Sequence, residues 1–292
     1  MIAASCPALF GLSLSSFRED EVNFTQKLTQ AMQKNNTLLC VGLDPDPERL
    51  PAGVSVLEFN RKIVEATADL VCAYKLNFAF YEVLGNEGLA VLKDTVSCIP
   101  DEIPVIGDAK RGDIGNTAKA YAKAIFTNFN FDATTVNPYL GFDSIEPFIQ
   151  YHDRGIFVLC RTSNAGAVDF QALCAKVEGK DLPLFEIVAR KASQWNVHGN
   201  IGLVVGATYP EELKTIRHNH PGMLLLIPGI GAQGGDVEST VRYGVDRKGE
   251  KAIINSSRQI IYASQGKDFA QAARRAAVDL RDQINRFRSH LQ

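Results

Sequence analysis

The chain has few of the features that mark disulfide-rich, membrane-spanning or metal-binding proteins. Its six cysteines are scattered, without a Cys-x-x-Cys pair, which favours free thiols in a reducing compartment over a disulfide scaffold. No apolar run reaches the ~18 residues that a membrane span requires, so no membrane partner is expected. The histidines lack metal-site spacing, apart from His218 and His220, which we expect in a solvated loop.

An excess of charge of one sign is also missing. The 31 basic and 33 acidic residues leave a formal net charge of −2, which gives no general attraction to nucleic acid. Residues 1–22 lack the basic start of a signal peptide, and Pro7 and several serines interrupt them. We therefore expect a cytoplasmic protein in which a flexible extension, 1–22, precedes the folded domain.

Apolar runs of strand type alternate with segments of helical periodicity. The expected strands are 38–44, 70–77, 103–110, 133–138, 155–163, 201–207, 223–230 and 251–258. Nearly continuous apolar strands are typical of a parallel sheet that is buried on both faces. An open doubly wound sheet is the alternative, but no dinucleotide-type glycine turn follows the first strand. With no linker in sight, residues 23–292 are predicted to form one α/β domain, a (β/α)8 TIM barrel.

Helical periodicity fills the intervals between these strands. Helices are expected from Asn23, whose side chain can cap the first, and then at 56–64, 85–98, 116–128, 145–151, 184–195, 210–218 and 269–291. Residues 165–182 show neither period, so an irregular insertion is expected there.

The most highly charged strand end is the segment 108–117, Asp-Ala-Lys-Arg-Gly-Asp-Ile-Gly-Asn-Thr. Side chains two apart on a strand share a face, so Asp108 and Lys110 should point the same way. Asp113 follows in the turn, and Thr117 comes about one helical turn later. A charged, anionic substrate is the first hypothesis. A buried structural ion pair is the alternative, although such pairs contribute little net stability.

Other strand ends carry polar residues that a barrel would bring to one face, because chemistry in such barrels sits at the carboxyl ends of the strands. These residues are Asp44, Lys75, Asn137, Thr162, Ser163 and Pro228. The last two strands lead into 229–235, which is rich in glycine, and into Asn255-Ser256-Ser257-Arg258. Small residues let backbone N–H groups approach phosphate, and Arg258 can add a bidentate contact. A phosphate site is therefore predicted there.

Together these motifs resemble the orotidine 5′-phosphate decarboxylase family, and the long form of 108–117 is similar to its larger-subunit branch. The resemblance rests on Asp-x-Lys-x-x-Asp with Ile114 and Thr117, on Asp44 and Lys75 in their strand ends, on Pro228 to Gln233, and on Arg258. It extends from about residue 23 to the last helix.

The resemblance implies a cofactor-free decarboxylation of orotidine 5′-monophosphate to uridine 5′-monophosphate, the last step of de novo pyrimidine synthesis. Loss of carbon dioxide leaves a carbanion at pyrimidine C6, and without an electron sink only preorganised positive charge and a ready proton stabilise it. By the family's pattern, Lys110 supplies both and Asp108 lies beside it. Lys75 extends the row of alternating charges, and Asp113 enters from the second subunit of a homodimer.

The resemblance also implies substrate contacts. Asp44 and Lys75 would hold ribose hydroxyls, and Thr117 would reach the ribose of the neighbouring subunit. Ser163 would contact the pyrimidine edge, with Thr162 as an open alternative, and Gln233 would bridge base and phosphate. Arg258 would bind the phosphate, although Ser257 stands where a glycine often precedes that arginine. The segment 232–249 would close as a lid.

Two other functions remain as alternatives. A metal-dependent sugar-phosphate lyase or synthase of the same superfamily would share Asp-x-Lys-x-x-Asp, but such enzymes usually place an acid where Lys75 stands, because a lysine repels Mg²⁺. A non-catalytic barrel would bind nucleotides without turnover.

Overall fold

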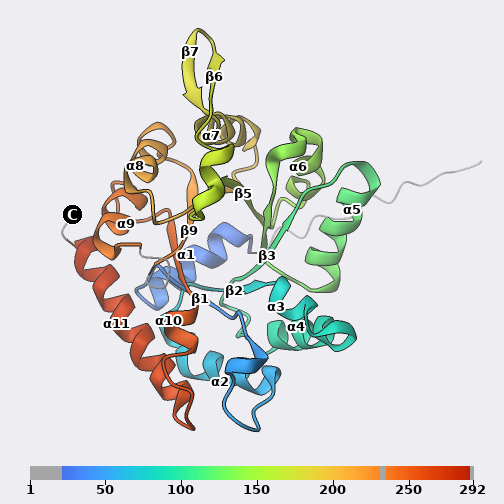
Figure 1. Ribbon diagram of the computed structural model, residues 1–292, viewed down its shortest axis with the longest axis vertical. Coiled ribbons are helices and arrows are strands. Elements are labelled where there is room, and N and C mark those ends of the chain that lie inside the picture. Colours follow the sequence, from blue (N-terminus) through green and yellow to red (C-terminus); the bar gives the residue numbers. More distant parts are fainter. Residues whose placement is uncertain (1–21, 231–234, 290–292) are drawn as a thin grey trace, which may run out of the picture.

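The computed structural model of the protein describes residues 22–230 and 235–289. Within these residues, eight parallel strands close into a barrel in the order β1-β10-β9-β8-β5-β4-β3-β2 (Figure 1). The strands are β1 Leu39–Gly42, β2 Ala73–Asn77, β3 Val105–Arg111, β4 Ala133–Val136, β5 Gly155–Arg161, β8 Ile201–Val205, β9 Leu224–Pro228 and β10 Ala252–Ser256. The predicted (β/α)8 fold is confirmed. The extension predicted at 1–22 lies, except for Val22, outside the described residues.

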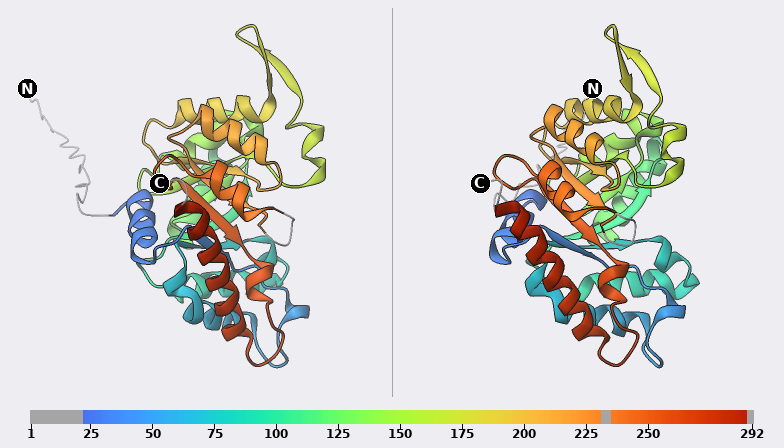
Figure 2. Two further views of the ribbon diagram at one scale, coloured as in Figure 1. Left: turned by 90° about the vertical axis from the view of Figure 1, so that its left-hand side faces the viewer. Right: turned by 60° about the vertical axis from the view of Figure 1, so that its left-hand side comes forward.

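Helices surround the barrel (Figures 1 and 2). They are α1 Phe24–Lys34, α2 Val56–Thr67, α3 Ala79–Glu82, α4 Gly88–Ser97, α5 Gly115–Lys123, α6 Phe142–Ile149, α7 Leu184–Trp195, α8 Pro210–Asn219, α9 Val237–Gly244, α10 Arg258–Ile261 and α11 Phe269–Ser289. A π-helical turn continues α5 to residue 128. Because α9 lies within 232–249, part of the segment expected as a closing loop is a helix instead. In the described part of the chain, no helix is long and apolar enough to cross a membrane.

Helix α1 covers the amino-terminal end of the barrel. As predicted, Asn23 caps it: its side chain accepts from the Gln26 N–H at 3.0 Å, and the Gln26 side chain accepts from the Asn23 N–H. Phe24 is buried against Phe157 of β5 in an apolar cluster inside the barrel. A Cβ atom at Gly155 would collide with the Phe24 ring, so this glycine lets the helix approach the strands.

The insertion after β5 is more regular than expected. Strands β6 Cys174–Val177 and β7 Lys180–Pro183 pair antiparallel, and their hairpin projects from the barrel (Figure 2). The two turn residues, Glu178 and Gly179, have φ angles of 51° and 80°, as a tight hairpin turn requires. The prediction of an irregular segment at 165–182 was therefore wrong for 174–182, because these strands are too short and too exposed to show a clear alternation.

A second correction concerns His220, which was expected in a solvated loop. It ends α8 and is only 8% exposed, and its Nε2 lies 3.4 Å from Glu186 Oε1 of α7. Packing between two helices therefore buries a residue that the local sequence presents as polar loop.

Candidate active site

The carboxyl ends of the barrel strands enclose a cavity of about 460 Å³. Its lining includes most of the predicted site residues, namely Asp44, Lys75, Asp108, Lys110, Ser163, Pro228 and Arg258. These residues come from six strand ends that are distant in sequence and meet at one face of the closed barrel. Closure of the barrel thus brings together polar residues that lie at the ends of separate strands along the sequence.

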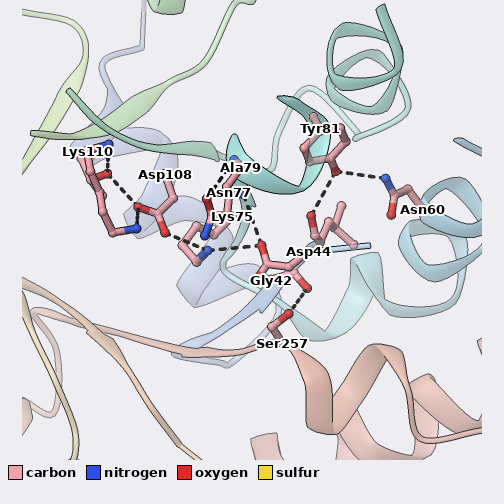
Figure 3. Close-up of polar contacts among 12 residues, drawn as sticks. Gly42, Asp44, Asn60, Lys75, Asn77, Ala79, Tyr81, Asp108, Lys110 and Ser257 are labelled. Atoms are coloured by element: carbon pink, nitrogen blue, oxygen red, sulfur yellow. Dashed lines mark hydrogen bonds and ion pairs between the residues drawn. The ribbon is translucent and has the colours of Figure 1, made fainter. Parts of the chain in front are cut away.

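Alternating charges form a row at one side of this cavity (Figure 3). Lys75 Nζ lies 3.5 Å from Asp44 Oδ1 and 3.2 Å from Asp108 Oδ2. Lys110 Nζ lies 2.7 Å from the other oxygen of Asp108, Oδ1. The Lys75 side chain is 5% exposed and that of Lys110 is 47% exposed. Asp108 therefore holds two ammonium groups, and Lys110 is the more accessible of the two.

The two central members of the row, Asp108 and Lys75, are charged at neutral pH. Burial alone would raise the pKa of Asp108, but the ammonium groups of Lys75 and Lys110 and the hydroxyl of Thr135 lower it to about 2. Thr135 Oγ1 donates to Asp108 Oδ1 at 2.8 Å. Burial alone would lower the pKa of Lys75, yet the carboxylates of Asp44 and Asp108 together raise it above its usual value. The result is a fixed electrostatic field at the cavity wall.

A distortion of β3 orients Lys110. The register of β3 with β4 shifts between Gly107 and Arg111, and Lys110 has a φ of 48°, a left-handed conformation that is unfavourable for residues other than glycine. The Lys110 N–H donates to Thr135 Oγ1 at 3.0 Å. Lys110 meets Asp108 as predicted, but through an irregular strand end and not through the regular alternation that was assumed.

The structure separates the two hydroxyls at the end of β5. Thr162 Oγ1 donates to Asn164 Oδ1 at 2.7 Å and accepts from Gln171 Nε2 at 2.8 Å. Ser163 Oγ is buried and has no hydrogen-bond partner within the described residues. A Cβ atom at Gly206 would collide with it, so the glycine that directly follows the neighbouring strand β8 gives the hydroxyl its space. Of the two, Ser163 is free to bind a ligand.

The predicted phosphate site lies at the ends of β9 and β10. Pro228 is the last residue of β9, and the carbonyl of Gly229 after it accepts from the Gly235 N–H at 3.1 Å. Arg258 begins α10, lines the cavity and is exposed. Gln233, predicted to bridge base and phosphate, lies outside the described residues.

Ser257 takes the place where the resemblance leads one to expect glycine. Its Oγ donates to the Gly42 carbonyl at 3.0 Å (Figure 3). A Cβ at Gly42 would lie 2.7 Å from Ser257 Cβ, so the two residues are matched in size. The serine hydroxyl thereby ties the start of the predicted phosphate site to β1.

Three predicted residues lie apart from the cavity. Asp113 Oδ1 accepts from the Ile114 N–H at 2.8 Å, Ile114 is 54% exposed, and Thr117 on α5 is exposed as well. None of the three is among the described residues that line the cavity. Within one subunit they form no part of the site.

Some residues that line the cavity were not predicted from the sequence, and others were assigned only a minor role. Asn77 and Thr135 line the cavity but were not predicted, while Asn255 and Ser256 were expected only as small neighbours of a phosphate. Asn255 Oδ1 and Ser256 Oγ are buried with no hydrogen-bond partner in the described part of the chain. All four lie at or near strand ends, so attention to uncharged polar residues there would have found them.

Comparison with known proteins identifies the family. The model of the Orotidine 5'-phosphate decarboxylase / HUMPS family matches residues 37–276. The chain belongs to this family. An Orotidine 5'-phosphate decarboxylase from Dehalococcoides mccartyi (strain CBDB1) is 57% identical over 267 residues, covering 91% of this chain and 99% of the relative. The resemblance inferred from the motifs is thus confirmed.

Solved structures of family members have the same fold. Leishmania donovani OMP decarboxylase superposes with a TM-score of 0.80 at 39% identity, covering 91% of this chain and 99% of that one. Leishmania donovani UMP synthase superposes with a TM-score of 0.82 at 41% identity. The match covers 92% of this chain and 57% of the longer UMP synthase chain.

Proposed function

We propose that the protein decarboxylates orotidine 5′-monophosphate to uridine 5′-monophosphate, the last step of de novo pyrimidine synthesis. The observation that carries this proposal is the charge row, in which the buried Asp108 holds the half-exposed Lys110 ammonium at 2.7 Å beside the cavity. The row lies in a chain that shares 57% identity with an Orotidine 5'-phosphate decarboxylase.

Lys110 has two roles in this mechanism. When the C6–carboxylate bond breaks, its electron pair stays at C6, where the nearby ammonium stabilises the developing negative charge. An N–H bond of Lys110 then breaks as a C–H bond forms at C6. The resulting amine takes up a proton from water, and carbon dioxide leaves. The reaction needs no cofactor because the cation is already in place.

The other charges keep the cation in place. Asp108 and Lys75 are buried and joined at 3.2 Å, so little rearrangement is needed when the reaction occurs. Enzymes lower barriers by ~8–23 kcal/mol, and a slow decarboxylation requires the upper part of that range. One lysine does not supply it, so binding of phosphate and ribose contributes too.

Different residues of the cavity bind the phosphate, the ribose and the pyrimidine of the nucleotide. Arg258, with the backbone near Gly229, binds the phosphate, and Asp44 with Lys75 binds the ribose hydroxyls. Ser163 binds the edge of the pyrimidine, which its unpartnered Oγ supports. Pro228 contributes to the wall at the same end. Gln233 stays assigned to the bridge between base and phosphate as a prediction.

The protein acts as a homodimer in which Asp113, Ile114 and Thr117 complete the site of the other subunit. Ile114 and Thr117 are exposed, and none of the three is among the described residues that line their own cavity, which supports this proposal. Exposed apolar side chains follow β2 and β4, the two neighbours of β3, and such a patch is typical of an interface. They are Val83 at 73%, Tyr139 at 80%, Leu140 at 48% and Phe142 at 41% exposure.

A metal-dependent sugar-phosphate enzyme remains the nearest alternative. A divalent cation would compete for Asp44 and Asp108, but the Lys75 ammonium lies within 3.5 Å of both. Among residues 22–230 and 235–289, no group of three or more His, Cys, Asp and Glu side chains could hold a metal ion. These observations favour the decarboxylase.

One assay tests the activity: the ultraviolet absorbance of orotidine monophosphate is followed with the purified protein, with and without EDTA. We expect the absorbance to change at equal rates in both samples. Activity lost with the chelator would favour the metal enzyme. Nucleotide binding without turnover would favour the non-catalytic barrel.

The shared site has its own test. Lys110→Ala and Asp113→Ala are each expected to be inactive, but a mixture should regain activity because hybrid dimers contain one intact site. A mixture that exchanges subunits and stays inactive would contradict the shared site.

A further inference from the structure

One side chain of the insertion, Gln171, holds the loop that carries Ser163. Gln171 Oε1 accepts from the Thr162 N–H at 2.8 Å, and Gln171 Nε2 donates to Thr162 Oγ1 at 2.8 Å. The backbone of Gln171 is itself held, since its N–H donates to the Ala167 carbonyl at 2.9 Å and its carbonyl accepts from the Phe185 N–H at 3.0 Å. One amide group thus binds two polar groups of Thr162 from a fixed position.

Arg161 supports the same contact from the protein interior. It is 1% exposed, its Nε–H pairs with Glu212 of α8, and its guanidinium lies 3.8 Å from the centre of the Tyr209 ring. A charge-assisted pair together with cation–π contact holds such a group firmly. Its Nη1 lies 3.4 Å from Gln171 Oε1 and 3.5 Å from the Thr162 carbonyl. Gln171 Oε1 is therefore oriented by two donors, the Thr162 N–H and Arg161 Nη1.

A register shift in β5 accompanies this arrangement. The pairing of β5 with β8 is irregular between Leu159 and Arg161, and strand irregularities of this kind redirect side chains near active sites. Leu159 lines the cavity, whereas Arg161 turns to Glu212 of α8. The loop that follows lines the cavity with Thr162, Ser163 and Asn164, and Gln171, which is not among the lining residues, holds it through Thr162.

We propose that Gln171 is a positioning residue for recognition of the base. It occupies the N–H and hydroxyl of Thr162, so that neither competes for the Ser163 hydroxyl, which stays directed at the pyrimidine. Gln171 is not among the described residues that line the cavity and acts through Thr162. This inference rests on the proposed function, in which Ser163 contacts the base.

The test compares a ligand with a base and a ligand without one. Calorimetry on the full chain measures the affinities of uridine 5′-monophosphate and of ribose 5-phosphate for Gln171→Met, which keeps the length of the side chain and removes its hydrogen bonds. We expect about tenfold weaker binding of the nucleotide and less than about twofold change for the sugar phosphate. KM should rise more than kcat falls, because binding of the base is lost in ground and transition states alike.

Conservative and control variants complete the design. Gln171→Glu keeps an acceptor for the Thr162 N–H but has no donor for Thr162 Oγ1, whose own proton goes to Asn164 Oδ1. It should therefore restore only part of the nucleotide affinity. Glu178→Gln, which breaks a surface ion pair with Arg190 at 3.0 Å in the hairpin, should leave both affinities unchanged. Gln171→Asn, whose shorter side chain loses the same bonds, makes the comparison if Gln171→Met does not fold.

Two results would overturn the proposal. Unchanged nucleotide affinity in Gln171→Met would show that Thr162 holds Ser163 without help. Equal weakening of both ligands would show a general loosening of the cavity. A wild-type protein that binds the nucleotide but does not turn over orotidine monophosphate would refute the proposed activity. The affinities of the two ligands for wild type and Gln171→Met would still test the role of Gln171.

Discussion

The amino-terminal and carboxyl-terminal ends of the barrel use the same strands but bury different kinds of side chain. At the amino end, Phe24 and Phe157 meet edge to face, with ring centres 5.8 Å apart. At the carboxyl end, Lys75 and Asp108 are buried together with polar atoms that have no partner in the described residues, such as Ser163 Oγ. Buried polar groups left unpaired are unfavourable, so the carboxyl end is built for a ligand and the amino end for stability.

Cavity size alone would not distinguish the two ends. Each encloses a cavity, of about 340 Å³ under α1 and about 460 Å³ at the strand ends. What differs is the ionic row at the carboxyl end, of which Lys75 and Asp108 are buried. The comparison therefore predicts that substitutions at one end change catalysis with little loss of stability, and that substitutions at the other end do the reverse.

The largest effect is expected for Lys110→Ala. Turnover should fall by about 10⁴-fold or more, because both the cation and the proton donor are lost. Binding of uridine 5′-monophosphate and the thermal unfolding midpoint should change little. Absorbance assays, calorimetry and thermal unfolding measure the three quantities.

A surface lysine at the other end is the matched control. Lys34→Ala on α1 removes only an exposed ion pair with Glu102 at 3.2 Å and should leave turnover unchanged. Near-wild-type turnover of Lys110→Ala would refute the mechanism.

At the amino end, Phe24→Ala should lower the free energy of unfolding by about 3–5 kcal/mol, because it removes a large buried ring and leaves a cavity. The folded fraction should keep its kcat, since Phe24 lies at the opposite end from Lys110. Urea unfolding and activity per folded molecule measure the two effects. Normal stability together with an impaired kcat in Phe24→Ala would contradict the assignment of stability to the amino end and catalysis to the carboxyl end.

A smaller effect should appear with pH, and Asp108 at the carboxyl end should account for one part of it. The folded pKa of Asp108 is about 2, below its usual 3.8, so its charge contributes stability above pH 4. That contribution, on the order of 2 kcal/mol, should disappear as pH falls from about 4 to about 2. Lys75 has a raised pKa, so its contribution is present below its usual pKa and is lost only in strong alkali.

The free energy of unfolding, measured by urea unfolding between pH 4 and pH 2, checks whether stability falls with pH as expected. Asp108→Asn should lose this part of the pH dependence, whereas Phe24→Ala should lower stability equally at every pH. Other carboxylates, such as Asp69 and Asp236, also have lowered pKa values, so some slope should remain in Asp108→Asn. A slope between pH 4 and 2 as steep as that of the wild type would contradict the role of Asp108.

The smallest effect on stability is expected for Ser163→Ala. Nucleotide affinity should fall about tenfold with the loss of hydrogen bonding to the base, while the free energy of unfolding stays constant or rises by up to about 1 kcal/mol, because a buried unpaired hydroxyl is removed. Calorimetry and urea unfolding on the same preparation decide it. A clear loss of stability would show that the hydroxyl has a structural partner.

The parts that sequence predicts well are those encoded locally. Apolar runs and their periods gave the barrel strands, and the geometry of a barrel then placed Asp44, Lys75, Asp108 and Lys110 at one mouth. The Asn23 cap was readable for the same reason, since its partner Gln26 lies three residues away.

What sequence did not predict depends on contacts between distant segments. The irregular ends of β3 and β5 arise from pairing with their neighbours, and the choice between Thr162 and Ser163 depends on Gln171, in a segment that shows no period. The roles of Asp113, Ile114 and Thr117 depend on the proposed second subunit, so they stay predictions.

The bridge that Asp108 makes between Lys75 and Lys110 matters for anyone who wishes to move this chemistry to another protein. Asp44 belongs to the end of β1, Lys75 to β2, and Asp108 to the irregular β3 in which Lys110 has its left-handed backbone. Copying the four side chains onto regular strands would leave the ammonium groups without their shared anchor. The unit to transplant is three adjacent strands together with their irregularity, and Thr135 of the fourth strand has to come with them.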